Sequence, residues 1–128
     1  MKYHFNKITD YTFDYAVEKI TEELKKEGFG IVAQIDMKKI LKEKLNKDFR
    51  NYKILEACNP NFAFRSLSAE DKIGIYLPCN IVVQEIDEKT TEIAVVNPVV
   101  MMESVENEEM KKIAQEIQAK LLRALAQV

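Results

Sequence analysis

The apolar and polar residues of this chain follow two periods, and each change of period marks a new element. Residues 3–8 alternate between apolar and polar side chains, which predicts a half-buried first strand. An amphipathic helix should follow from about Thr12 to Glu27, with Asp10 or Thr12 as its N-cap and Gly28 as the residue that ends it. Its apolar stripe consists of Phe13, Ala16, Val17, Ile20 and Leu24.

Two more strands and a short helix are expected in the middle of the chain. Alternation over 29–35 predicts a second strand, and Asp36 is placed to cap a short helix. The third strand covers 52–59 and ends there, because the residue before Pro60 is disfavoured in the helical region. The apolar residues of the short helix are Ile40, Leu41 and Leu45.

The second half of the chain predicts two further strands and the longest helix. One or two helical turns are expected over 61–67, followed by a loop over 68–71. A fourth strand should start at about Cys79, and a fifth should cover 91–96. The last helix should start near Ser104, with an apolar stripe formed by Met110, Ile113, Ala114, Ile117, Leu121, Leu125 and Val128.

This order of elements predicts one α+β domain over residues 1–128. Its strands should form a mostly antiparallel five-stranded sheet, with the first and last helices packed on one face. The second face would then lack a helix, and Val82 and Val96 indicate that it is apolar in places. A homodimer would cover such a face.

Composition excludes several classes of protein. With 47% hydrophobic residues, 31% charged residues and a net charge of -2, the chain suits a globular core and lacks the basic excess of a nucleic-acid-binding protein. Neither a signal peptide nor an apolar run near the ~20 residues of a membrane span is present, so we expect a cytoplasmic protein with no membrane contact. The two cysteines should therefore be thiols.

Familiar catalytic motifs are missing. With three glycines, the chain has no room for the glycine-rich loops that bind nucleotide phosphates, and its one histidine, His4, lies on the first strand. We therefore predict no cofactor and no catalytic residue of a known type.

Two related segments are the main candidates for a site: Cys58-Asn59-Pro60 and Pro78-Cys79-Asn80. If the third and fourth strands bring them together, two thiols and two carboxamides could line a pocket for a small polar ligand. The thiols could instead bind a metal or form a reversible disulfide. A third interpretation is that both cysteines are buried apolar residues and both asparagines bond turns and strand ends.

Other candidates depend on charge. Glu56 shares a strand face with Cys58 and could be a general base or an exposed residue, and Arg65 could bind an anion or lie at the surface. Residues 36–50 contain six Lys or Arg against three acids, whereas residues 85–109 contain eight acids and one base. These regions could guide self-association or could simply be solvated.

The order of several short motifs resembles one family. The runs are Gly28-Phe29, Gln34-Ile35-Asp36, 52–60 (YKILEACNP), 73–83 (IGIYLPCNIVV), Asn97-Pro98 and Met101-Met102. Together they resemble the prokaryotic family known as domain of unknown function 302, and the likeness covers nearly the whole chain. Glu56 departs from the pattern, because the family usually has a glycine there, and Asn61-Phe62 replaces a more usual proline-leucine pair.

The resemblance implies a β-α-β(4)-α fold similar to TATA-box-binding-protein-like domains, and a homodimer. It implies no activity, and a fold shared with a DNA-binding protein transfers no DNA binding. The family's most characteristic positions fall on the two Cys-Asn segments. We therefore predict a cytoplasmic, homodimeric module that binds a small ligand around these segments, with Glu56 and Arg65 nearby. The alternatives are a metal-binding or redox protein that uses Cys58 and Cys79, and a hydrolase or isomerase that uses Glu56.

Overall fold

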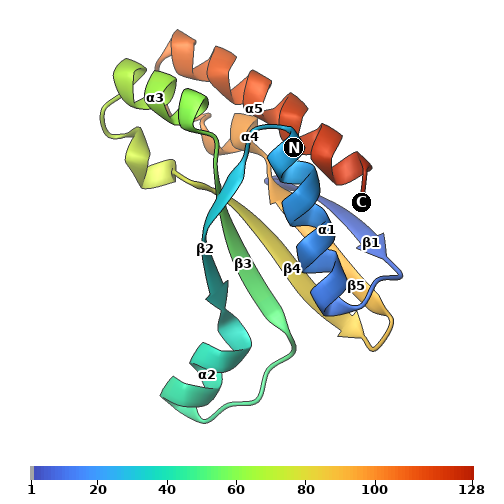
Figure 1. Cartoon of the computed structure of the whole chain (residues 1–128). Helices are drawn as coiled ribbons and strands as arrows, with labels where there is room; N and C mark the ends of the chain where they lie inside the picture. The colour runs from blue at the N-terminus through green and yellow to red at the C-terminus, as the bar shows by residue number, and fades with distance from the viewer. Residues whose placement is uncertain (1) are drawn as a thin grey trace.

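The computed structural model describes residues 2–128 and contains one five-stranded sheet with short and long helices around it (Figure 1). The strand order is β1-β5-β4-β3-β2, and every neighbouring pair is antiparallel. The strands are β1 (His4–Thr9), β2 (Gly30–Asp36), β3 (Tyr52–Cys58), β4 (Cys79–Asp87) and β5 (Thr90–Val96). The prediction of an α+β fold with a five-stranded antiparallel sheet is confirmed.

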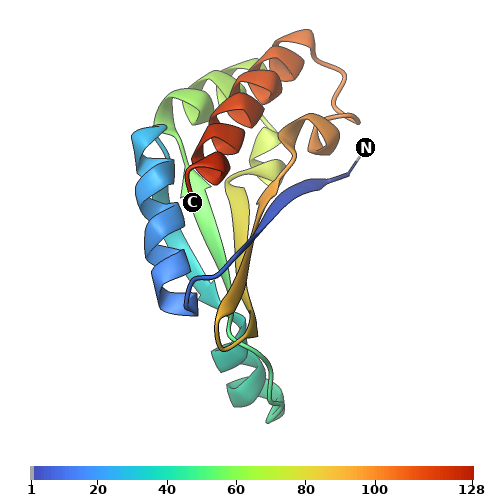
Figure 2. The same ribbon diagram turned by 90° about the vertical axis from the view of Figure 1, so that its right-hand side faces the viewer.

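Helices α1 (Phe13–Lys26) and α5 (Glu108–Ala126) lie together on one side of the sheet (Figures 1 and 2). The predicted apolar stripes of both helices are buried there against alternate residues of the strands. On β4 and β5 the buried residues on this side are Cys79, Ile81, Val83, Thr91, Ile93 and Val95. The core therefore lies between one face of the sheet and these two helices.

The residues that begin and end α1 are among those that the sequence predicted. Thr12, and not Asp10, is the N-cap, and its hydroxyl accepts a hydrogen bond from the Tyr15 amide (3.3 Å). At the other end, Gly28 has φ +89°, and the Phe29 amide bonds back to the Leu24 carbonyl (2.9 Å). This left-handed residue turns the chain sharply from α1 into β2.

Four segments differ from their predictions. Helix α3 (Pro60–Ala69) continues through two residues of the expected loop, and α5 starts at Glu108 because Asn107 caps it. A four-residue helix α4 (Pro98–Met101) was not predicted, and a 3-10 turn η1 (Ile73–Tyr76) precedes β4. Helices α3 and α4 start at the same pair, an asparagine N-cap with a proline in the first turn.

Helix α2 (Met37–Leu45) projects beyond the end of the sheet (Figure 1). Asp36 caps it as predicted, accepting from the Lys39 amide (3.0 Å), and Asn46 ends it with a left-handed φ of 53°. None of its residues is buried, although it is amphipathic. We call residues 36–51 the α2 arm.

No helix within residues 2–128 combines the length and apolar character needed to cross a bilayer.

Candidate functional site

The two Cys-Asn segments lie side by side, as their strands predicted. In the β3–β4 pair, Ala57 is opposite Cys79 and Glu56 is opposite Asn80. The alternation of β4 then separates the two residues of its segment, since Cys79 is buried beneath the helices and Asn80 is exposed. The eight candidate site residues are therefore divided between the two sides of the sheet and the surface of α3.

On the covered side, Cys58, Asn59, Pro78 and Cys79 line one small cavity. Apolar residues of α3 and α5, among them Phe62 and Ile117, close it. Its volume is about 20 Å³, which is the space of roughly one water molecule. A metabolite does not fit in a cavity of this size.

Asn59 connects two helix ends beside this cavity. Its side-chain oxygen accepts from the Asn61 and Phe62 amides (3.2 and 3.4 Å), which caps α3, and its Nδ2 donates to the Glu27 carbonyl (3.3 Å). Gly28 allows this contact, because a Cβ there would lie 2.8 Å from Nδ2. Pro60 occupies the first turn of α3. Asn59 and Pro60 thus already have a structural role, as the cap and the first-turn residue of α3.

The same double contact recurs at two other asparagines. Asn97 caps α4 and donates to the Lys2 carbonyl (3.1 Å), and Asn107 caps α5 and donates to the Ala69 carbonyl (2.9 Å). The sequence analysis did not predict these caps, although the two Asn-Pro pairs are a local signal for those of α3 and α4. The distant carbonyls have no local signal. The three asparagines fix where α3, α4 and α5 begin.

The Cys79 thiol is poorly suited to thiolate chemistry. Burial, and secondarily the neighbouring Cys58, raise its pKa from 9.0 to about 11, so it is protonated at neutral pH. Cys58 is partly exposed, and both cysteines are free thiols. Within the described chain, no group of three or more His, Cys, Asp or Glu side chains is placed to share a metal ion.

Arg65 lies on α3 and ties that helix to α5. Its guanidinium donates to both carboxylate oxygens of Glu116 (3.2 and 2.7 Å) and lies 3.6 Å from a Glu109 oxygen. The same contact raises the pKa of Arg65 and lowers the pKa of Glu116. Protein carboxylates therefore occupy the donors that we had considered for an anionic ligand.

The uncovered side of the sheet, which we call the open face, carries the remaining candidates. None of its strand residues is fully buried, and the register arranges them in three rows. The middle row is apolar except for its last residue: Ile35, Ile54, Val82, Ala94 and Asn6. The two outer rows are mixed: one carries Ala33, Glu56, Asn80, Val96 and His4, and the other carries Tyr52, Gln84, Glu92 and Ile8.

A hollow of about 370 Å³ lies over β3, β4, β5 and β1 on this face. Val82, Ala94 and Val96 contribute apolar surface, and Asn80 contributes a carboxamide. Glu56 is opposite Asn80 on the neighbouring strand but does not line the hollow. Of the eight candidate residues, only Asn80 therefore lines a space large enough for a small molecule.

A chain of hydrogen bonds crosses the same face from the α2 arm to β1. Arg50 Nε donates to Gln84 Oε1 (2.9 Å), Gln84 Nε2 donates to Glu92 Oε1 (2.9 Å), and Asn6 Nδ2 donates to Glu92 Oε2 (3.0 Å). Sequence reasoning missed Gln84 and Glu92, because only the strand order places them beside Asn6 and Tyr52.

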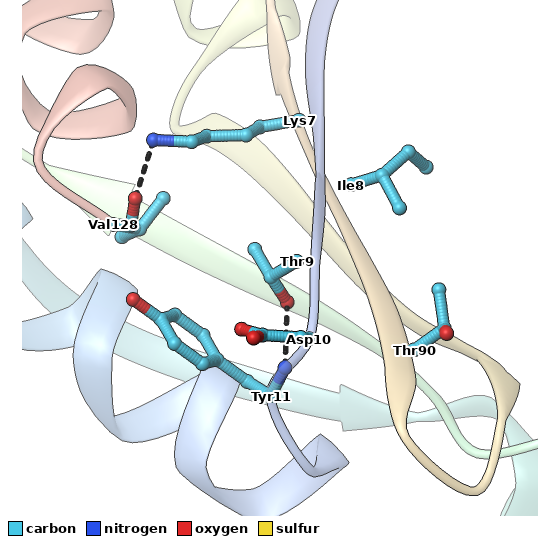
Figure 3. Close-up of a pocket in the computed structure, with 7 residues that line it drawn as sticks. All are labelled: Lys7, Ile8, Thr9, Asp10, Tyr11, Thr90 and Val128. Carbon is cyan, nitrogen blue, oxygen red and sulfur yellow. Dashed lines mark hydrogen bonds between the residues drawn. The ribbon is translucent and has the colours of Figure 1, made fainter.

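Another hollow, of about 470 Å³, lies between β1, the start of α1 and the end of α5 (Figure 3). Two of its polar side chains, those of Lys7 and Thr9, have partners in the protein. Lys7 Nζ donates to the Val128 and Ala126 carbonyls, and the Thr9 hydroxyl bonds both the Thr91 carbonyl (2.8 Å) and the Tyr11 amide (3.4 Å). The Lys7 contacts attach the end of α5 to the sheet.

Comparison with known proteins places the chain in a family. The family model of domain of unknown function DUF302 matches residues 5–128. The chain belongs to the DUF302 family. A solved structure, of an uncharacterised conserved DUF302 protein from Bacillus stearothermophilus, is 31% identical with a TM-score of 0.91, and the match covers 99% of this chain and 98% of that chain. No curated protein matches the sequence.

For this DUF302 chain, membership confirms the family resemblance and the fold but brings no activity. The β-α-β(4)-α order expected for the family is the order of its main elements, with α2, α3 and α4 as additions. The function has to be inferred from the geometry of the chain itself.

Proposed function

We propose that this DUF302 protein is a non-enzymatic module that binds a small ligand in the hollow of the open face. The observation that carries the proposal is the combination of about 370 Å³ of space with an apolar floor and a few polar groups, Asn80, Gln84 and Glu92 among them. Small-molecule sites are typically hollows of ~300–1,000 Å³ with this composition. A cytoplasmic location, expected from the sequence, is part of the proposal.

In this proposal the two Cys-Asn segments have different roles. Asn80 contacts the ligand, whereas Asn59 and the two cysteines hold β3, β4 and α3 in register beneath it. The raised pKa of Cys79 favours this structural role over a metal-binding or redox role. Glu56 lies outside the hollow, which disfavours a hydrolase or isomerase that uses it as a base.

The ligand site is tested by binding to variants of its lining. The protein should be purified without added ligand, its intact mass measured under native conditions, and a metabolite set then screened by thermal shift. We expect Asn80→Ala and Val82→Lys to reduce the shift given by any hit, and Glu88→Ala, on the exposed β4–β5 turn, to leave it unchanged. A hit that binds both lining variants as tightly as the unmodified protein would contradict this assignment.

We also propose that the module is a homodimer in which the α2 arm contacts a second copy. The arm exposes apolar residues, with Ile40 37% and Leu45 62% accessible, next to Ile35 and Ile54 of the open face. It belongs to the basic region 36–50, and the acidic region 85–109 of a second copy has the complementary charge. Glu92 belongs to this acidic region and also lines the hollow, so in this proposal the arm contacts the other acids of the region and the ligand keeps access to Glu92.

The oligomer is tested by light scattering and sedimentation. We expect twice the chain mass for the unmodified protein and a shift toward monomer for Leu45→Glu. Ile75→Glu is the matched control, because Ile75 is 82% exposed on η1, outside the arm. A monomeric unmodified protein at micromolar concentration would refute the dimer and leave the ligand proposal standing.

A further inference from the structure

The charged side chains that line the open-face hollow restrict the chemical class of ligand that it can bind. Among its lining residues, Glu92 is the one carboxylate, and neither lysine nor arginine is present. Its two oxygens accept from the neutral amides of Asn6 and Gln84. Within residues 2–128, Glu92 takes part in no ion pair. Its negative charge is therefore oriented by hydrogen bonds but not neutralised by direct contact.

Arg50 bonds to Gln84 but forms no ion pair with Glu92. Arg50 donates to the far side of the Gln84 amide, and its guanidinium lies 4.3 Å from the centre of the Phe49 ring. The Gln84 side chain thus separates the guanidinium from the carboxylate. Arg50 orients Gln84, and through it Glu92, without filling the hollow.

The aromatic residues of the lining differ in their distance from Glu92. Tyr52 lies in the same row of the sheet as Glu92, and the Arg50 guanidinium lies 6.0 Å from the centre of its ring. Tyr3 and His4 line the opposite end of the hollow, at the start of β1. Glu92 is therefore the group of the lining that selects the charge of a ligand.

We propose that the hollow binds a small organic ammonium ion with an apolar body. The ammonium group lies by Glu92, and the apolar body covers Val82, Ala94 and Val96. This inference rests on the proposed ligand site and adds the chemical class of the ligand. A neutral or anionic molecule of the same shape would leave the Glu92 charge unmatched and should bind more weakly.

The test compares three probes of similar shape and different charge: benzylammonium, benzyl alcohol and benzoate. Each is titrated into isotopically labelled protein at neutral pH and low salt, and the shifted amide signals are mapped. We expect benzylammonium to shift signals of β3, β4 and β5 and to bind roughly tenfold more tightly than benzyl alcohol, with benzoate weakest. Added salt should reduce this preference.

Variants then assign the preference to Glu92. Glu92→Gln keeps an oxygen acceptor and should remove the preference for the cation, as should Gln84→Lys, which places a cation beside the carboxylate. Glu88→Gln is the control, because it removes the same charge from the exposed turn between β4 and β5. Unchanged amide spectra away from the substituted residue show that each variant is folded.

The outcomes separate this inference from the proposed function. Equal binding of benzylammonium and benzyl alcohol on the open face, or a preference that survives Glu92→Gln, overturns the ammonium class and leaves the ligand site in place. Signals that shift elsewhere, or no shift at millimolar benzylammonium, also overturn it. If, in addition, every thermal-shift hit binds outside the hollow, the ligand site itself is refuted.

Discussion

The two faces of the sheet are built from the same strands but differ in what covers them. On β4, Ile81 is fully buried beneath α1 and α5, whereas its neighbour Val82 lies half-buried in the open-face hollow. The covered side of the sheet packs apolar side chains against the helices, and the open side carries amides and a carboxylate between its apolar residues. Because the side chains of a strand point alternately to its two faces, consecutive residues of β4 contribute to the core and to the candidate site.

The largest expected effect tests this contrast directly. Ile81→Ala removes fully buried side-chain volume and should lower the free energy of unfolding by about 2–5 kcal/mol. Val82→Ala, one residue along, should cost less than about 1.5 kcal/mol, because solvent already reaches that site. Chemical denaturation of both variants measures the difference. Equal losses would indicate that the open face is covered in solution, as a dimer through its centre would require.

The next effect concerns the covered side at alkaline pH. The pKa of Cys79 is about 11 in the folded protein and near 9.0 when unfolded. Between these values the unfolded chain releases a proton that the folded chain retains, so stability falls as pH rises. About two pKa units correspond to a loss of roughly 2–3 kcal/mol by pH 11.

Comparison with Cys79→Ala isolates this contribution from those of lysines and tyrosines. The difference in unfolding free energy between the two proteins should be constant up to about pH 8 and should then shrink by that amount toward pH 11. A difference that stays constant over this window would contradict the buried, protonated state of Cys79. Thiol reagents should modify the partly exposed Cys58 faster than Cys79.

The sequence predicted what local periodicity controls. It identified α1 and α5 with their buried apolar stripes, and the positions of all five strands, because each depends on spacing within one segment. It also placed the two Cys-Asn segments on neighbouring strands. Period-two alternation would already have separated Cys79 from Asn80, and that signal was in the sequence.

Features that depend on strand order could not be predicted in the same way. The hollow needs β5 between β1 and β4, since only this order places Glu92 beside both Asn6 and Gln84. The side-chain amides of Asn59, Asn97 and Asn107 donate to carbonyls that lie 32 to 95 positions away in the sequence. No local sequence pattern predicts hydrogen bonds over such separations. The hydrogen bond between Arg65 and Glu116 likewise forms only because α3 lies along α5.

A smaller effect should distinguish the two Cys-Asn segments. Asn59→Ala removes the cap of α3 and the bond to Glu27, and it should cost about 1–2 kcal/mol of stability. Asn80→Ala should change stability by less than about 0.5 kcal/mol, because the Asn80 side chain is exposed on the open face. Asn59→Asp keeps the cap but loses the donor, so it should fall between these values. Similar costs for Asn59→Ala and Asn80→Ala would show that the sheet does not divide the segments as described.

The smallest expected effect concerns Arg65, on the surface of the covered side. Arg65→Met keeps an unbranched side chain of similar length but removes the ion pairs with Glu116 and Glu109. Exposed ion pairs contribute little, so the loss of stability should be the least of this series and should decrease further in salt. It should also fade at acidic pH, because Glu116, whose pKa the pair lowers, becomes protonated there and the pair is lost in the unmodified protein as well. If Arg65→Met instead left this pH and salt response unchanged and abolished binding of an anion such as phosphate, Arg65 would belong to a ligand site after all, and the division between a structural side and a binding side would have to be redrawn.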